Sequence, residues 1–111
     1  MAWTVETLNS IVDDEIDALP VDMRARLSRI ADLISTAGLE AVHEPHIKHI
    51  KGALWEIRMK GKDGIARALY VTAQKKRVVI VRVFIKKTEK TPRHEIELAL
   101  ARAKEVKNDQ D

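Results

Sequence analysis

Apolar side chains in the first third of the chain recur at intervals of three and four residues, the period of an α-helix. A first stripe follows Ser10, which resembles an N-cap with Asp13 as a partial capping box, and it ends at Pro20. A second stripe predicts a helix over residues 21–37 that Gly38 closes in a left-handed conformation. Together they predict a helical hairpin, whose stripes are Leu8, Ile11, Val12, Ile16 and Leu19, then Met23, Leu27, Ile30, Ala31 and Ile34.

In the second half of the chain the apolar period changes from 3.6 to 2, which predicts strands. Residues 53–60 alternate between apolar and mostly polar positions, and an Asp-Gly turn at 61–64 predicts a hairpin with residues 65–72. Residues 78–85 are apolar at every position except Arg82. That pattern is typical of a central strand covered on both faces.

The remaining segments complete the fold prediction. Residues 2–6 predict a short strand, and residues 41–52 are interpreted as a polar linker. Thr91 and Pro92 predict the cap and first position of a last helix, whose apolar stripe is Ile96, Ala99, Leu100 and Ala103. The order β-α-α-β-β-β-α predicts an α+β domain: a small antiparallel sheet, an N-terminal helical hairpin and a C-terminal helix. Because 111 residues bury one ordinary core, we expect a single domain over 1–111.

Composition excludes several classes of protein. The chain has no cysteine, which excludes a disulfide framework, a thiol nucleophile and any cysteine-ligated metal site. No apolar run approaches the roughly 20 residues of a membrane span, and the acidic N-terminus lacks the pattern of a signal peptide. We therefore expect a cytoplasmic protein with no membrane partner.

Charge is distributed very unevenly along the chain. Residues 1–47 carry three basic and nine acidic side chains, a net charge of −6. Residues 48–93 carry fourteen against three, net +11, and residues 94–111 carry three against five, net −2. A basic segment between acidic ones predicts a surface for phosphate or another polyanion, with a solvated cationic sheet edge as the alternative.

The basic segment contains none of the usual catalytic motifs. It has no glycine-rich phosphate loop, no Gly-x-Ser-x-Gly, no His-Glu-x-x-His and no carboxylate pair. His43, His46 and His49 recur at intervals of three, but Pro45 disfavours the helix that would align them, and no cysteine or carboxylate shell accompanies them. We therefore predict surface histidines, no metal site and no cofactor.

Cations and aromatic residues alternate along the predicted strands. Arg58 and Arg67 can be neighbours across the hairpin, since paired strands lie about 5 Å apart. A sheet face with several cations and one or two aromatic rings suits nucleic acid, because cations bind phosphates and rings stack on bases. The candidate RNA-binding residues are Lys48, Lys51, Lys60, Tyr70, Phe84, Lys86 and Lys90, although Tyr70 and Phe84 could equally be core residues.

Three segments together resemble a known family. LWEIR, ARALY and VRVFIKKTEKTP, followed by a helix rich in Glu and Ala, are similar to the RelE/HigB superfamily of type II toxins, especially its phage-derived HigB-like branch. FIKKTEKTP is the most specific piece, and the resemblance extends over about residues 3–106. It implies a ribosome-dependent, metal-free mRNA endonuclease, in which the ribose 2′-OH attacks the adjacent phosphate and leaves a 2′,3′-cyclic phosphate. It also implies two partners, the ribosome with its mRNA and a cognate helix-turn-helix antitoxin of the HigA type.

The resemblance implies roles for individual residues. Arg58 and Arg67 match the family's strand cations, of which Arg67 would bind the scissile phosphate. Lys87, with Lys86, stands where a cation stabilises or protonates the leaving oxygen. The family's usual base near the start of the last helix is missing, and His94 is the candidate that replaces it, since histidine commonly transfers protons near neutral pH.

Three points leave alternatives open. Ideal alternation places Arg67 with Ile65 and Leu69 but Tyr70 on the opposite side, so either a bulge intervenes or both faces are partly covered. The function also has competitors: a ParE-like toxin that inhibits DNA gyrase without cutting RNA, and a basic RNA-binding module with no toxicity. Arg58 could likewise be a structural partner of Glu56 or Glu44.

Overall fold

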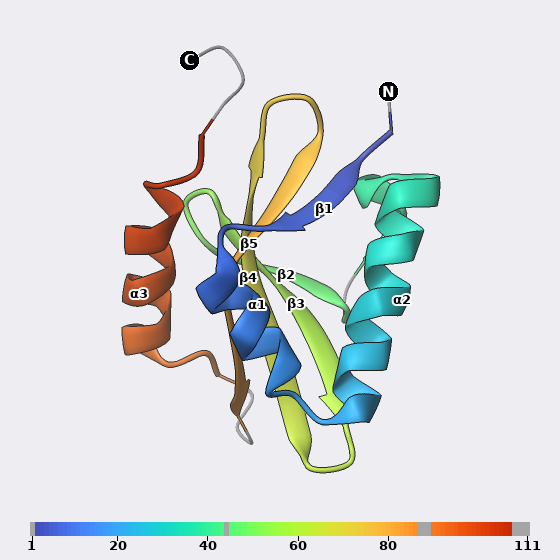
Figure 1. Ribbon diagram of the computed structural model, residues 1–111, viewed down its shortest axis with the longest axis vertical. Coiled ribbons are helices and arrows are strands. Elements are labelled where there is room, and N and C mark those ends of the chain that lie inside the picture. The colour runs from blue at the N-terminus through green and yellow to red at the C-terminus, as the bar shows by residue number, and fades with distance from the viewer. Residues whose placement is uncertain (1, 44, 87–89, 108–111) are drawn as a thin grey trace.

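One mixed sheet with helices on both faces makes up the fold (Figure 1). The computed structural model describes residues 2–43, 45–86 and 90–107. Its strands lie in the order β1-β5-β4-β3-β2. In chain order the elements are β1 (Thr4–Thr7), α1 (Ser10–Asp17), α2 (Val21–Ala37), the short 3-10 helix η1 (Leu39–Ala41), β2 (Ile47–Lys51), β3 (Leu54–Gly61), β4 (Gly64–Ala73), β5 (Arg77–Lys86) and α3 (Arg93–Ala103).

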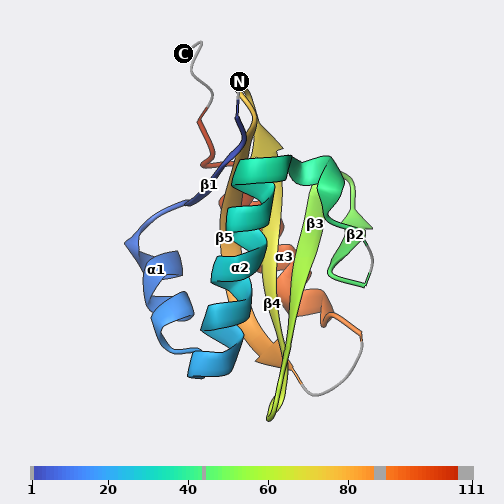
Figure 2. The same cartoon turned by 90° about the vertical axis from the view of Figure 1, so that its right-hand side faces the viewer.

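The helices divide the core into two layers, one on each side of the sheet. Figure 2 shows α2 in front of the sheet and α3 behind it. The stripes of α1 and α2 pack on one face with Ile57, Met59, Ala68 and Ile80, and we call this the hairpin face. Ala99 and its neighbours in α3 pack on the other, the α3 face, against Leu69, Val79 and Val81. The prediction that residues 78–85 form a strand covered on both faces is confirmed, and β1 makes the strand an interior one along Arg77–Ile80.

Two features of the predicted sheet are wrong. The segment interpreted as a polar linker contains β2, an edge strand that pairs with β3, so the sheet has five strands. Its polar, histidine-rich residues obscure the alternation because most of them stay exposed at the edge. The sheet is also not wholly antiparallel, since β1 pairs with β5 in parallel. Local sequence carries no signal for a pairing between residues more than 70 positions apart.

The bounds of α2 follow the prediction, whereas α1 ends at Asp17, before Pro20, and two caps differ. The second helix spans Val21–Ala37 as predicted, and Gly38 follows it with a φ of 94°. The N-cap of α1 is Asn9, whose Oδ1 accepts a hydrogen bond from the Val12 N–H at 3.1 Å, so Ser10 is not the cap. The N-cap of α3 is Pro92, because the Thr91 hydroxyl is engaged elsewhere.

A bulge in β5 sets which side chains face α3. Leu69 pairs with Arg82 and Tyr70 pairs with Ile80, so Val81 is an additional residue on β5. Val81 packs in the α3 layer, and Arg82 reaches α3 as well. The β3–β4 hairpin has the predicted turn, with Gly61 opposite Gly64.

Candidate cationic site on the sheet

Strand register places the predicted cations in two rows on the α3 face. In the first row Arg58 of β3 lies opposite Arg67 of β4, which lies opposite Phe84 of β5. In the next row the partners are Lys60, Ile65 and Lys86. Six residues from three strands thus form one site because their alternation is in phase. Ideal alternation places Arg67 and Tyr70 on opposite faces of the sheet, which left a bulge or two covered faces as explanations. Both faces are covered, and β4 has no bulge of its own.

A buried hydrogen-bonded chain connects the two arginines. Arg67 Nη1 donates to Thr91 Oγ1 at 3.0 Å, and the Thr91 hydroxyl donates to Glu56 Oε1 at 2.7 Å. Glu56 Oε2 lies 3.1 Å from Arg58 Nε. Arg67 is 0% exposed and Glu56 is 1% exposed, whereas the Arg58 side chain is 16% exposed. Of the two arginines, Arg58 is therefore the one that a ligand on this face meets first.

Glu56 provides the charge that permits two arginines to lie side by side. Like charges directly opposite each other destabilise a sheet, and an uncompensated buried charge costs several kcal/mol. The buried carboxylate offsets both cations, one through an ion pair and the other through Thr91. The suggestion that Arg58 pairs with Glu56 is confirmed, and the same contact fixes Arg58 on the site.

A second charge network borders the site on β5. Arg82 Nε lies 2.6 Å from Glu95 Oε1 of α3, and Arg82 Nη1 lies 2.8 Å from Glu15 Oε2 of α1. The hydrogen bond to Glu95 is the main cause that raises the pKa of Arg82. Its guanidinium also lies 5.8 Å from the Phe84 ring centroid. Carboxylates from α1 and α3 therefore already engage Arg82.

The other predicted RNA-binding lysines flank these rows. Lys48 lies on β2 opposite Glu56, and Lys51 lies opposite Leu54. Both are exposed, as are Lys60, Lys86 and Lys90. Phe84 is mostly buried against the α3 layer. Lys87 lies outside the described residues.

Tyr70 does not belong to the site. It is 1% exposed and packs in the core of the hairpin face, on the opposite side of the sheet from Arg67. Burial raises its pKa to about 12. The prediction that this ring stacks on RNA is therefore corrected to a core role.

His94 stands at the start of α3, three residues after Thr91. Its side chain is 75% exposed, and its Nε2 lies 3.7 Å from Glu95 Oε2. This position borders the Thr91 end of the buried chain, but no contact joins His94 to Arg58 or Arg67 among the interactions of the described residues. The structure thus leaves His94 available to solvent or ligand.

The histidines of residues 43–49 are dispersed. The His49 ring packs edge-on against Trp55, with centroids 4.9 Å apart, and its Nε2 lies 2.8 Å from the Gly52 carbonyl oxygen. His43 and His46 lie in different hollows. Within residues 2–43, 45–86 and 90–107, no group of three histidine, aspartate or glutamate side chains is placed to hold a metal ion.

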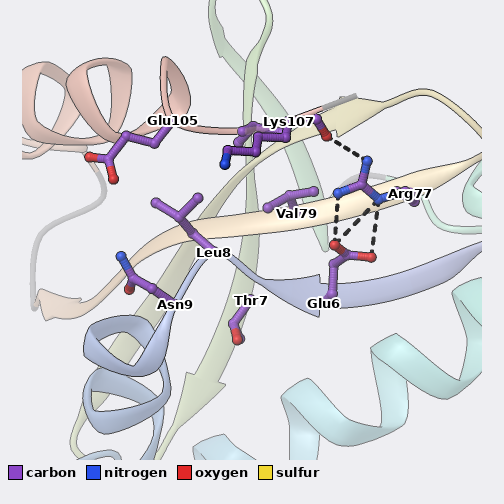
Figure 3. A pocket seen from close by; sticks show the side chains of 9 residues that line it. Glu6, Thr7, Leu8, Asn9, Arg77, Val79, Glu105 and Lys107 are labelled. Carbon is purple, nitrogen blue, oxygen red and sulfur yellow. Dashed lines mark hydrogen bonds and ion pairs between the residues drawn. The ribbon is translucent and has the colours of Figure 1, made fainter. Parts of the chain in front are cut away.

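Two hollows lie away from the cationic rows. One, shown in Figure 3, lies between β1, β5 and the end of α3, where Arg77 is held by Glu6 at 2.9 Å and by the Lys107 carbonyl at 2.7 Å. The other is mainly apolar and is lined by Trp3, Val42, Trp55 and Tyr70 among others. Neither presents a cluster of cations. None of the described helices is long and apolar enough to cross a membrane.

Sequence reasoning missed Glu56 and Thr91 as members of the site. Thr91 carries a strong local signal for a helix cap, and its tertiary hydrogen bonds override that signal. Glu56 is acidic within a basic segment, and its position on the same strand face as Arg58 was the available clue.

Comparisons with known proteins agree with this architecture. The family model described as phage-derived protein Gp49-like matches residues 14–104. Among solved structures, the crystal structure of the archaeal RelE-RelB complex from Pyrococcus horikoshii contains a similar chain, with a TM-score of 0.55 and 19% sequence identity. The match covers 77% of this chain and 96% of that one. At that identity the likeness concerns the fold. No curated protein matches the sequence.

Proposed function

The chain belongs to the phage-derived Gp49-like family, a RelE/HigB-like toxin family, and from that premise we propose that it is the toxin of a type II toxin–antitoxin system that cuts mRNA on the ribosome. The coarser part of this proposal, a toxin with a RelE-like fold, rests on the family and on the solved structure. The finer part, ribonuclease activity, rests on the cationic rows.

One observation carries the nuclease proposal: Arg58 and Arg67 are direct cross-strand partners at the centre of a cationic face. Transesterification of RNA passes through a state with extra negative charge on the phosphate oxygens. Preorganised guanidinium groups stabilise such charge, most strongly where water is excluded. The arrangement needs neither a metal nor a carboxylate pair.

The proposed reaction balances with the groups present. The ribose 2′-oxygen bonds to the neighbouring phosphorus, its proton passes to His94, and the bond to the 5′-oxygen of the next nucleotide breaks. Lys86 supplies charge or a proton to that leaving oxygen, and Lys87 is proposed to share this role. The products are a 2′,3′-cyclic phosphate and a 5′-hydroxyl. Arg58 contacts the phosphate first, and Arg67 adds its charge from beneath.

Glu56 and Thr91 act as positioning residues in this proposal. Their hydrogen bonds hold both guanidinium groups in one orientation, so little reorganisation is needed when the phosphate arrives. Lys48, Lys51, Lys60 and Lys90 would contact the RNA backbone or ribosomal RNA around this centre.

The partner that silences the toxin is proposed to be a cognate antitoxin of the helix-turn-helix, HigA-like type. The similar archaeal chain was crystallised as a RelE-RelB complex, which supports an antitoxin partner in general. Acidic antitoxin side chains would complement the same cationic face that binds mRNA.

Induced expression in a bacterial host tests the proposal. We expect arrested translation and new mRNA 5′ ends that carry a hydroxyl group and lie within translated codons. Intact mRNA together with altered DNA supercoiling would instead indicate a gyrase inhibitor.

A further inference from the structure

A small basic groove lies at the open edge of β3, beyond the end of β2. Its volume is about 250 Å³, and it is lined by Arg26, Pro45, His46, Arg58, Lys60 and Ile65. Arg26 comes from α2 and His46 from the segment before β2. No acidic side chain of the described residues lines it. The groove therefore gathers the cations of two separate elements, α2 and β3.

The backbone adds a donor to this groove. The Arg58 N–H donates to the His46 carbonyl at 2.8 Å, and the Lys62 N–H donates to Asp22 Oδ2 at 2.8 Å. Alternate N–H groups of a strand point to the same side, so the Lys60 N–H also points toward this edge. It lies between two satisfied neighbours and meets no acceptor from the described residues outside the sheet.

The electrostatics of the groove favour a bound anion. Arg26 and Lys60 are exposed, and neither forms an ion pair with another described residue. Arg58 is paired with Glu56 at 3.1 Å, so the exposed Arg26 and Lys60 supply the charge that an anion in the groove would meet. In the hollow of Figure 3, by contrast, Glu6 holds the arginine. Phosphate sites in proteins commonly combine convergent cations with a backbone N–H donor that points into the site.

We propose that this groove binds a backbone phosphate of single-stranded RNA next to the phosphate at the Arg58–Arg67 pair. Arg58 lines the groove and also begins the first cationic row, so it connects the two positions. The groove thereby makes α2 and the segment before β2 part of the substrate surface. The assignment of the anion to RNA rests on the proposed function.

RNA binding by the purified chain tests the groove without any requirement for cleavage. The probe is a fluorescent single-stranded oligoribonucleotide, titrated at several salt concentrations. Arg26→Ala should weaken binding several-fold at low salt and reduce the slope of log affinity against log salt by about 0.7, the loss of one phosphate contact on a single strand. Arg24→Ala removes the same charge from the same helix outside the groove and should leave the slope unchanged.

Other outcomes separate this inference from the proposed function. If RNA binding depends on Arg26 but the protein cuts no mRNA on ribosomes, the phosphate site in the groove stands and the nuclease proposal is refuted. Equal effects of Arg26→Ala and Arg24→Ala on RNA affinity would overturn the proposed phosphate site. The absence of RNA binding by the wild type at low salt would overturn it as well. An oligoglutamate peptide serves as a second probe. If binding of this peptide needs Arg26 and binding of RNA does not, the groove is assigned to an acidic protein partner and the RNA assignment is overturned.

Discussion

Arg58 and Arg67 lie directly opposite each other on β3 and β4, although both carry a positive charge. Sheets normally avoid such a pair, and here a buried carboxylate and a threonine hydroxyl compensate it. A protein that needed only stability would gain more from apolar residues at these positions. The arrangement is therefore best explained by a demand for concentrated positive charge on this face.

Removal of the compensating carboxylate should destabilise the fold. Glu56→Ala removes the carboxylate that pairs with Arg58 and accepts from Thr91, and we expect the free energy of unfolding to fall by about 3 kcal/mol. Thr91→Val, which keeps the shape and removes one hydroxyl, should cost about 1 to 2 kcal/mol. Urea denaturation measures both values. A loss below about 0.5 kcal/mol for Glu56→Ala would show that the carboxylate does not compensate the arginines.

Glu15 should protect the part of the β5 edge that β1 does not cover. Its Oε1 accepts from the Val83 N–H at 3.0 Å, and its Oε2 lies 2.8 Å from both Arg82 Nη1 and Arg102 Nη1. In Glu15→Ala we expect faster hydrogen exchange at the Val83 amide and a loss of about 2 to 3 kcal/mol in unfolding free energy. Asp14→Ala, on the same helix, is the matched control. Unchanged exchange at Val83 would exclude this role.

The single tyrosine should titrate only at very high pH. Burial raises the pKa of Tyr70 to about 12, against an ordinary value near 10, so the unfolded chain loses this proton first as the pH rises. Stability from the neutral phenol is complete below pH 10 and is lost toward pH 12, by roughly 2 to 3 kcal/mol. Ultraviolet titration of the phenolate and alkaline unfolding measure this.

Tyr70→Phe is the control for that titration, since it keeps the ring and removes the ionisable group. Because every other ionisable group is the same in both proteins, the difference between them isolates the contribution of Tyr70. A phenolate that appears near pH 10 without unfolding would contradict the buried position on the hairpin face.

His94 should contribute to the rate of cleavage and not to the fold. His94 is proposed to accept the proton of the 2′-OH, so His94→Ala should lower the cleavage rate by about 10²-fold or more. Single-turnover cleavage on programmed ribosomes measures this rate. Arg93→Ala changes the neighbouring exposed residue, which pairs with Glu97 at 3.3 Å, and should leave the rate nearly unchanged. Equal rates for wild type and His94→Ala would remove His94 from the mechanism.

Local patterns were sufficient for most elements and for the rows of the site. The stripe of α2 and the in-phase alternation of β3 and β4 depend only on neighbouring residues, so Arg58, Lys60 and Arg67 were placed together from the sequence. The strand β2 was not found, because an edge strand with exposed lysine and histidine lacks a clear apolar face.

Contacts between distant segments explain what the sequence could not provide. The hydroxyl of Thr91 bonds to residues 24 and 35 positions away, so no local rule assigns it to the site. Strand alternation alone places Tyr70 and Arg67 on opposite faces of the sheet. Contacts between distant segments decide which of these faces the helical hairpin covers and which one α3 covers.

Cleavage of mRNA by purified ribosomes, with and without the Arg58–Arg67 pair, tests the central claim most directly. In a reconstituted translation reaction, wild-type protein should produce mRNA 5′-hydroxyl ends within translated codons. Arg58→Ala should reduce that cleavage by about 10² to 10³-fold while the protein stays folded, as the loss of one preorganised donor implies. Arg67→Ala should do the same, with its thermal unfolding measured in parallel, and Arg24→Ala should cleave normally. Undiminished cleavage by folded Arg58→Ala and Arg67→Ala proteins would contradict the account.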